Sequence, residues 1–143
     1  MIVVDSSVWT DYFNGQMNAA TDLLYDLLGN EPILTGDLIY AEVLQGFQKD
    51  GDYIQAKRLF ESLTFGEMLG KDVALRSVDN YRRLRKKGVT IRKTIDMIIG
   101  TFCIETNMPL LHQDRDFDPM EKQRRFEPQK TAASFLRSYI KSQ

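Results

Sequence analysis

Carboxylates follow two short apolar runs of this chain, at positions where a parallel sheet would gather them. Asp5 comes directly after the apolar residues 2–4, and Asp114 and Asp116 come just after the apolar residues 109–111. In open parallel sheets, ligands bind at the carboxyl ends of the strands. We therefore expect these three side chains to meet at one edge of a sheet.

Two further carboxylates lie on predicted helices. Asp96 is in the first turn of its helix, where the helix dipole favours an anion, and Glu42 lies inside the helix that follows the second strand. Each has a glycine four residues later on the same helix face, Gly46 and Gly100. Glycine costs a helix about 1 kcal/mol relative to alanine. We interpret both glycines as places where another backbone packs closely.

A group of carboxylates has a chemical purpose when a cation binds it. Like charges repel and raise one another's pKa, and a hard divalent cation removes that conflict. Mg²⁺ and Mn²⁺ prefer oxygen ligands. Such an ion binds phosphate oxygens, activates water and stabilises a leaving oxygen. The carboxylates therefore indicate metal-dependent hydrolysis of phosphodiesters.

The elements that position these residues alternate along the chain. Apolar residues predict strands at 2–4, 32–34 and 109–111, with a minor strand at 64–65. Helical spacing predicts helices between them and a last helix over 132–140, after a segment at 126–128. This alternation is typical of an α/β sandwich with a mostly parallel sheet. We expect helix caps at Ser6 or Ser7, at Thr35 or Asp37, and at Thr94, and a helix break at residues 51–52.

Composition narrows the class of protein. The 143 residues suit a single domain, and the net charge of −1 argues mildly against a nucleic-acid binder unless acidic ligands offset a basic surface elsewhere. The single cysteine, Cys103, excludes an internal disulfide and favours a reducing cytoplasm. We find no secretory leader and no apolar run long enough for a membrane span.

A basic stretch offers a candidate surface for RNA phosphates. Its members lie in and after one predicted helix, namely Arg82, Arg85, Lys86, Arg92 and Lys93. They could bind phosphates. They could equally be a solvated helix end whose cations suit the C-terminal dipole.

Four motifs together resemble one family. The segments IVVDSSVW, AEVLQG, TIDMIIG and LLHQDRDF are similar, in order and spacing, to those of PIN domains and in particular of VapC-like toxins, over residues 2 to about 117. The resemblance implies a three-layer α/β/α sandwich and an endoribonuclease that uses Mg²⁺ or Mn²⁺. It assigns the metal to Asp5, Glu42, Asp96 and Asp114, with Asp116 and Ser6 as accessory residues. It also implies a homodimer and a VapB-like antitoxin whose tail blocks the site, and it leaves open a larger toxin–antitoxin assembly.

Several of these residues have an alternative role. Asp116 could belong to a turn, and Ser6 could only cap a helix. His112, where many members have threonine or serine, could be structural or a general base. Trp9 and Phe13 could lie in the core or in a partner groove, whereas Cys103 lies on an apolar helix face and suits the core.

Two other functions compete with the nuclease. A phosphatase with Asp5 as nucleophile typically needs an acid two residues later, where this chain has Ser7. A receiver-like signalling module needs a phosphorylated aspartate on a central strand, and no strand of that kind is evident. The sequence does not identify the RNA target or the number of metal ions.

Overall fold

A computed structural model describes residues 1–124, and these form a four-stranded parallel sheet. The strands are β1 (Ile2–Val4), β2 (Ile33–Gly36), β3 (Thr64–Gly66) and β4 (Leu110–Leu111). Their order across the sheet is β3-β2-β1-β4, and every pair is parallel. The expected segment at 126–128 and the helix over 132–140 lie outside the described residues.

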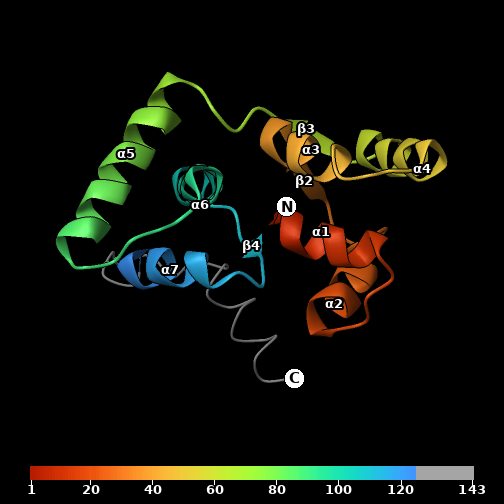
Figure 1. Ribbon diagram of the computed structural model, residues 1–143, viewed down its shortest axis with the longest axis horizontal. Coiled ribbons are helices and arrows are strands. Elements are labelled where there is room, and N and C mark those ends of the chain that lie inside the picture. The colour runs from red at the N-terminus through yellow and green to blue at the C-terminus, as the bar shows by residue number, and fades with distance from the viewer. Residues whose placement is uncertain (125–143) are drawn as a thin grey trace.

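Helices cover both faces of this sheet. The chain crosses from β1 to β2 to β3 in one direction and then returns to β4 at the other edge. Because such crossovers are right-handed, the helices of the return lie on the opposite face from the earlier ones. The first layer is α1 (Ser6–Phe13), α2 (Ala19–Leu27), α3 (Asp37–Leu44) and α4 (Asp50–Glu61), and the second is α5 (Lys71–Lys86) and α6 (Thr94–Thr106). Figure 1 shows these layers, with α7 (Asp118–Arg124) beside α6, so the expected three-layer sandwich is confirmed.

The strand order reverses between β1 and β4, and a crevice opens at such a point in open α/β sheets. Val3 pairs with Leu110 and Val4 with Leu111. The ladder continues to Asp5, whose backbone N–H donates to the carbonyl of Leu111 at 2.9 Å. Asp5 and the segment after β4 therefore lie side by side at the carboxyl edge.

The core lies on both faces of the strands. Val3, Val4 and Leu111 are fully buried, as both faces of a parallel sheet require. Trp9 is also fully buried and makes an edge contact with Phe60, with ring centroids 5.1 Å apart. Trp9 is thus a core residue, and half-buried Phe13 stacks beside it. Cys103 is buried, as expected. None of the helices within residues 1–124 is long and apolar enough to cross a membrane.

One helix boundary differs from the prediction. The predicted break at residues 51–52 is wrong, because both lie in the first turn of α4. The chain breaks earlier, since α3 ends at Leu44 and Phe47 lies outside it. Asp50 and Asp52 favour a helix start through the dipole, and that preference outweighs the glycine between them.

The capping residues also differ. Asp5 itself caps α1, and Gly36 and Lys93 occupy the cap positions of α3 and α6 without a side-chain bond. The expected caps at Ser6 or Ser7, at Thr35 or Asp37 and at Thr94 are therefore wrong by one or two residues. Helix α1 ends before residues 14–15, where Gly15 adopts φ +72°.

The two glycines that follow the helical carboxylates behave differently from each other. Gly46 lies past the end of α3, and a methyl group there would meet only the Val43 carbonyl at 3.4 Å. Gly100 is closely packed, because a methyl group would lie within van der Waals overlap of the Met120 thioether. The expectation that another backbone packs closely is therefore wrong for Gly46. At Gly100 the close packing is confirmed, but the neighbour is a side chain and not a backbone.

Candidate active site

Asp5 lies between β1 and α1, and only one of its two carboxylate oxygens is hydrogen-bonded within residues 1–124. Oδ2 accepts hydrogen bonds from the Ser7 backbone N at 3.1 Å and from Ser7 Oγ at 2.6 Å. Oδ1 is buried and has no hydrogen-bond partner within residues 1–124. Burial raises the pKa of Asp5 above its usual value, and the bonds from Ser7 lower it in part.

Glu42 reaches the same place from α3. Ser6 Oγ donates to Glu42 Oε1 at 2.8 Å. Partial burial raises the pKa of Glu42, the Ser6 bond lowers it, and the nearby Asp5 carboxylate raises it. The adjacent hydroxyls of Ser6 and Ser7 thus hold two carboxylates that come from different elements.

Asp96 is a further carboxylate of the cluster whose pKa is raised. It lies in the first turn of α6 and is only 4% exposed, and its Oδ2 has no hydrogen-bond partner in the described part of the chain. Burial raises its pKa to about 7, and the Asp5 and Asp114 carboxylates add to the effect while Lys93 opposes it. Loss of solvation therefore outweighs the helix dipole, which favours the charged form.

Asp114 and Asp116 follow β4 and sit next to Asp96. Asp114 Oδ1 accepts the backbone N–H of Asp116 at 3.0 Å, which starts the short 3₁₀ turn Arg115–Phe117. Carboxylate oxygens of Asp96, Asp114 and Asp116 lie within 4.8 Å of one another. Asp116 therefore forms part of a turn and also lies beside the acidic cluster.

An open cleft of about 330 Å³ lies at this edge of the sheet, and Asp116 is not among the residues that line it. The four carboxylates predicted to gather all line it, namely Asp5, Glu42, Asp96 and Asp114, and Ser6 and Lys93 lie among them. The structure therefore brings the predicted set together at the edge where β1 and β4 end. Whether these side chains bind a metal stays a prediction.

Four residues of the cleft were not predicted as site residues, namely Ser7, Thr10, Asp11 and Gln113. Gln113 donates to Asp11 Oδ2 at 2.6 Å and to the Ser7 carbonyl at 3.4 Å. It thereby joins the segment that carries Asp114 to α1. Ser7 was overlooked because its neighbour Ser6 matched the family position, although a hydroxyl two residues after a capping aspartate is a local signal for an extra bond.

The basic residues are spread more widely than predicted. Lys93 lines the cleft, and its Nζ lies 3.8 Å from Asp114 Oδ2. Arg92 lines a separate groove, and Arg85 approaches the Tyr81 hydroxyl on α5. Arg82 and Lys86 are exposed on α5. Of the five residues predicted to bind RNA, Lys93 alone lines the cleft, and the role of all five stays a prediction.

His112 has a structural setting. It is 1% exposed, and its Nε2 lies 2.5 Å from Glu121 Oε1 on α7. Its ring also packs against Phe117, with centroids 4.8 Å apart. These contacts fix the segment between β4 and α7, which favours the structural reading of His112 over the general-base reading.

The donor set fits a hard divalent cation. All charged groups of the cluster are carboxylates, apart from Lys93 at its rim. Two buried oxygens, Asp5 Oδ1 and Asp96 Oδ2, have no partner within the described residues. A buried carboxylate oxygen without a partner is costly, and a bound cation would provide such a partner.

Comparisons with known proteins indicate one family. A family model described as the PIN domain matches residues 2–123. VapC ribonuclease Mb1587 of Mycobacterium bovis and ribonuclease VapC11 of Mycobacterium tuberculosis are each 30% identical over 123 residues, covering 82% of this chain and 90% of the relative.

Solved structures share the fold at low identity. One is VapBC2 from Rickettsia felis bound to a DNA fragment from its promoter, with a TM-score of 0.65 and 18% identity over 82% of this chain and 92% of the other. Another is FitAcB from Neisseria gonorrhoeae, with a TM-score of 0.65 and 15% identity over 84% and 93%.

Proposed function

The chain belongs to the PIN-domain family, and from that premise we propose that it is a metal-dependent endoribonuclease toxin of the VapC type. One observation carries the proposal. Asp5 and Asp96 line the same cleft, and each has a buried carboxylate oxygen without a partner among residues 1–124. The names of the two mycobacterial relatives, both ribonucleases, support RNA as the substrate.

Mg²⁺ or Mn²⁺ is the proposed cofactor, held by Asp5, Glu42, Asp96 and Asp114 with Asp116 as an accessory acid. When bound, the ion supplies activation of water and neutralisation of charge on the phosphate. The chain's own residues orient the ligands: Ser7 holds Asp5, Ser6 holds Glu42, and Gln113 fixes the backbone beside Asp114. Ser6 therefore acts through Glu42 rather than through the phosphate.

Lys93 is proposed to contact the RNA. Its ammonium group lies at the rim of the cleft, where a phosphate beside the cluster would meet it. Arg82, Arg85, Lys86 and Arg92 are proposed to continue the basic path away from the cleft. This path reconciles an RNA substrate with a net charge of −1.

A VapB-like antitoxin is the proposed inhibitor, in the cytoplasm, and the toxin itself is proposed to be a homodimer. The cleft offers an anionic site that a cationic side chain can occupy. Lys93 already approaches Asp114 in this way. An inserted arginine or lysine of the antitoxin near Asp96 would block both the metal and the substrate.

The competing phosphatase has no support from the site. Ser7 stands where that mechanism needs an acid, and its hydroxyl is bound to Asp5 Oδ2. The structure likewise offers no observation that favours a receiver-like module over the nuclease.

The proposal is tested by incubating the protein with labelled single-stranded RNA in Mn²⁺ and in EDTA. Internal cleavage in Mn²⁺, absent in EDTA and restored by added Mn²⁺, is the expected result. RNA that stays intact in Mn²⁺, with a protein shown to be folded and free of antitoxin, would refute the nuclease.

A further inference from the structure

Asp11 and Gln113 form a polar pair in the acidic cleft, and neither is a proposed metal ligand. Asp11 lies on α1, and Gln113 lies between β4 and Asp114. Gln113 Nε2 donates to Asp11 Oδ2 at 2.6 Å and to the Ser7 carbonyl at 3.4 Å. Because both partners are acceptors, the nitrogen of the Gln113 amide must face them. The amide oxygen, Oε1, therefore points away from both.

Asp11, like Asp5, is held through one of its carboxylate oxygens. Asn18 Nδ2 also donates to Asp11 Oδ2, at 3.1 Å, so this oxygen receives two hydrogen bonds. Neither Asp11 Oδ1 nor Gln113 Oε1 accepts a hydrogen bond within residues 1–124. Both side chains are partly exposed and line the cleft. The pair therefore offers a ligand in the cleft two oriented acceptors and no donor.

We propose that this pair binds the Watson–Crick edge of a guanine and so selects the base at which the RNA is cut. The site rests on the proposed nuclease and adds the base that it recognises. Guanine is the RNA base whose Watson–Crick edge carries two adjacent donors, N1–H and the N2 amino group. Adenine and cytosine place a donor beside an acceptor, and uracil places one N–H between two carbonyls. Two neighbouring acceptors therefore match guanine, and unstacked bases of single-stranded RNA are recognised on this edge.

The charges of the cleft favour a base at this pair and a phosphate elsewhere. Asp11 repels phosphate oxygens. Lys93, the basic residue of the cleft within residues 1–124, precedes α6, which belongs to the opposite helix layer from α1. A phosphate near Lys93 can thus turn its base toward α1. Because Gln113 directly precedes Asp114, that base lies beside the proposed metal ligands.

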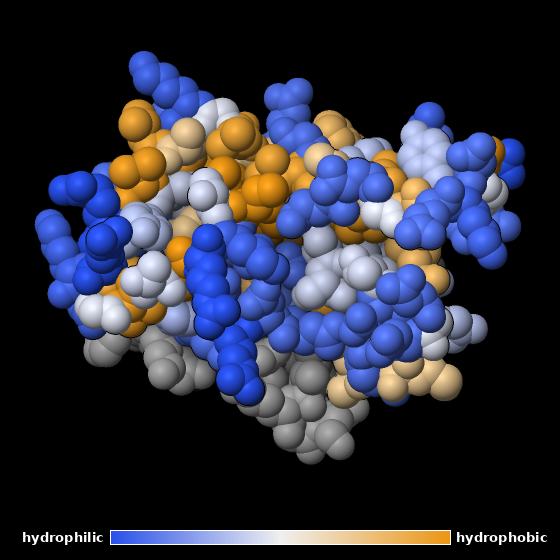
Figure 2. All heavy atoms as spheres, viewed as in Figure 1, coloured by the Kyte–Doolittle hydropathy of each residue, from blue (hydrophilic) through white to orange (hydrophobic). Residues whose placement is uncertain are grey.

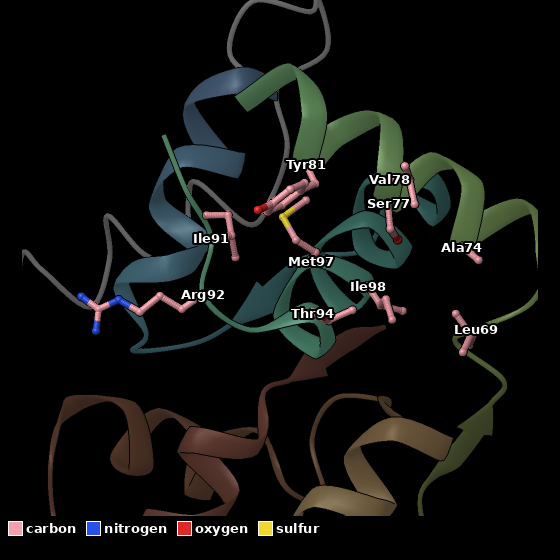
Figure 3. Close-up of a pocket in the computed structure, with 10 residues that line it drawn as sticks. All are labelled: Leu69, Ala74, Ser77, Val78, Tyr81, Ile91, Arg92, Thr94, Met97 and Ile98. Carbon is pink, nitrogen blue, oxygen red and sulfur yellow. The ribbon is translucent and has the colours of Figure 1, made fainter. Parts of the chain in front are cut away.

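The apolar groove between α5 and α6, of about 500 Å³, does not suit this kind of recognition. Figure 3 shows Ile91 and Ile98 among its side chains, with the Arg92 guanidinium directed away from them. Figure 2 shows apolar side chains gathered over this part of the molecule. The Ser77 hydroxyl donates to the Val73 carbonyl at 2.7 Å. Stacking on such a surface tolerates every base, so selection by hydrogen bonds belongs to the acidic cleft.

The test measures RNA binding by fluorescence anisotropy in Ca²⁺, where cleavage is suppressed. The probes are short uridine oligomers that carry one guanine, adenine, cytosine or inosine at the centre. We expect the guanine probe to bind about tenfold more tightly than the others, since paired hydrogen bonds to a base discriminate by about this factor. Inosine lacks the N2 amino group and should bind more weakly than guanine. A probe with 7-deazaguanine keeps the recognised edge and should bind as the guanine probe does.

Asp11→Asn distinguishes base recognition from a structural role. The introduced amide can keep its oxygen toward Asn18 and Gln113, so its NH₂ group takes the place of the free carboxylate oxygen. A donor beside the Gln113 oxygen matches adenine or cytosine. The variant should therefore lose the preference for guanine and bind the adenine or the cytosine probe more tightly than the guanine probe. Loss of packing alone would weaken binding of all probes without this exchange.

Gln113→Ala should also reduce the preference for guanine, because it removes one acceptor and releases Asp11. Asp26→Asn is the matched control, since this exposed aspartate lies on α2 outside the cleft, and it should keep the full preference. Circular dichroism checks that the variants fold. Equal binding of all probes by the wild type, or an unchanged preference in Asp11→Asn, would overturn the guanine site. Cleavage in Mn²⁺ without a guanine preference would overturn this site alone, whereas a guanine preference without cleavage would refute the nuclease alone.

Discussion

Ser7 donates two hydrogen bonds to a single oxygen of Asp5, at 3.1 Å from its backbone N and 2.6 Å from its hydroxyl. The other oxygen, Asp5 Oδ1, is left buried and without a partner in the described part of the chain. The bonds fix the orientation of the carboxylate and lower its pKa against the effect of burial. Ser7 is therefore a positioning residue for the proposed metal site.

Ser7→Ala should weaken Mn²⁺ binding by about 10- to 100-fold, because groups that orient metal ligands contribute this much. The loss should be largest at low pH, since removing the bond raises the pKa of Asp5 further. Calorimetric titration with Mn²⁺ across a pH series measures both effects. Ser62→Ala is the control, because that exposed hydroxyl bonds only to the Leu59 carbonyl on α4. Equal affinities for Ser7→Ala and wild type would show that Ser7 does not position Asp5.

The raised pKa of Asp96 makes stability depend on pH when metal is absent. A folded-state pKa of about 7, against an ordinary value of 3.8, means that the folded protein binds the extra proton. This contribution to stability is complete below about pH 4 and is lost as the pH rises through about 7. In EDTA, the free energy of unfolding of Asp96→Asn minus that of wild type should therefore increase from pH 4 to 8. Urea denaturation measures it, and a difference that stays flat or falls would contradict the raised pKa.

Metal binding should restore the stability that is lost by holding buried charged carboxylates together. An ion that binds only the folded state adds about 2.7 kcal/mol at a hundredfold excess over its dissociation constant. Thermal melts of the wild type should shift upward with Mn²⁺, and the shift should shrink in Asp96→Asn. Asp52→Asn, an exposed acid on α4, should keep the full shift. A shift of the same size in all three proteins would mean that the ion binds elsewhere.

Lys93 should contribute one phosphate contact. Lys93→Ala should lower RNA affinity and reduce the slope of log affinity against log salt by about 0.7, the value for one contact to a single strand. Fluorescence anisotropy in Ca²⁺ or EDTA, where cleavage is suppressed, measures this slope. Lys57→Ala serves as the control, since Lys57 pairs with Glu61 on α4. An unchanged slope for Lys93→Ala would remove Lys93 from the RNA path.

The carboxylates that follow the strands could be predicted from the sequence, because the order of parallel strands determines which strand ends are neighbours. Asp5 and Asp114 follow apolar runs that form adjacent parallel strands, so their meeting follows from the strand order. Asp96 was predictable from its helix turn. The cause of the raised pKa of Asp96 was not predicted correctly. Repulsion between carboxylates was expected, whereas burial of the side chain, which is 4% exposed, is the larger effect.

Contacts between distant segments were beyond prediction. Gln113 and Asp11 are 102 residues apart, and nothing in either neighbourhood indicates that they bond. Local rules also competed with one another at the start of α4, where acidic residues outweighed Gly51. At Gly100, the packing partner turned out to be the side chain of Met120, which lies 20 positions later in the chain.

The most direct test of the account combines cleavage and metal binding in Asp96→Asn. The substitution keeps the size of the side chain and removes the charge that the metal needs. We predict that the variant folds, binds Mn²⁺ far more weakly by calorimetry, and no longer cleaves RNA, while Asp52→Asn behaves as wild type in all three respects. Wild-type cleavage and Mn²⁺ affinity in a pure preparation of Asp96→Asn would contradict the assignment of this cleft as the active site.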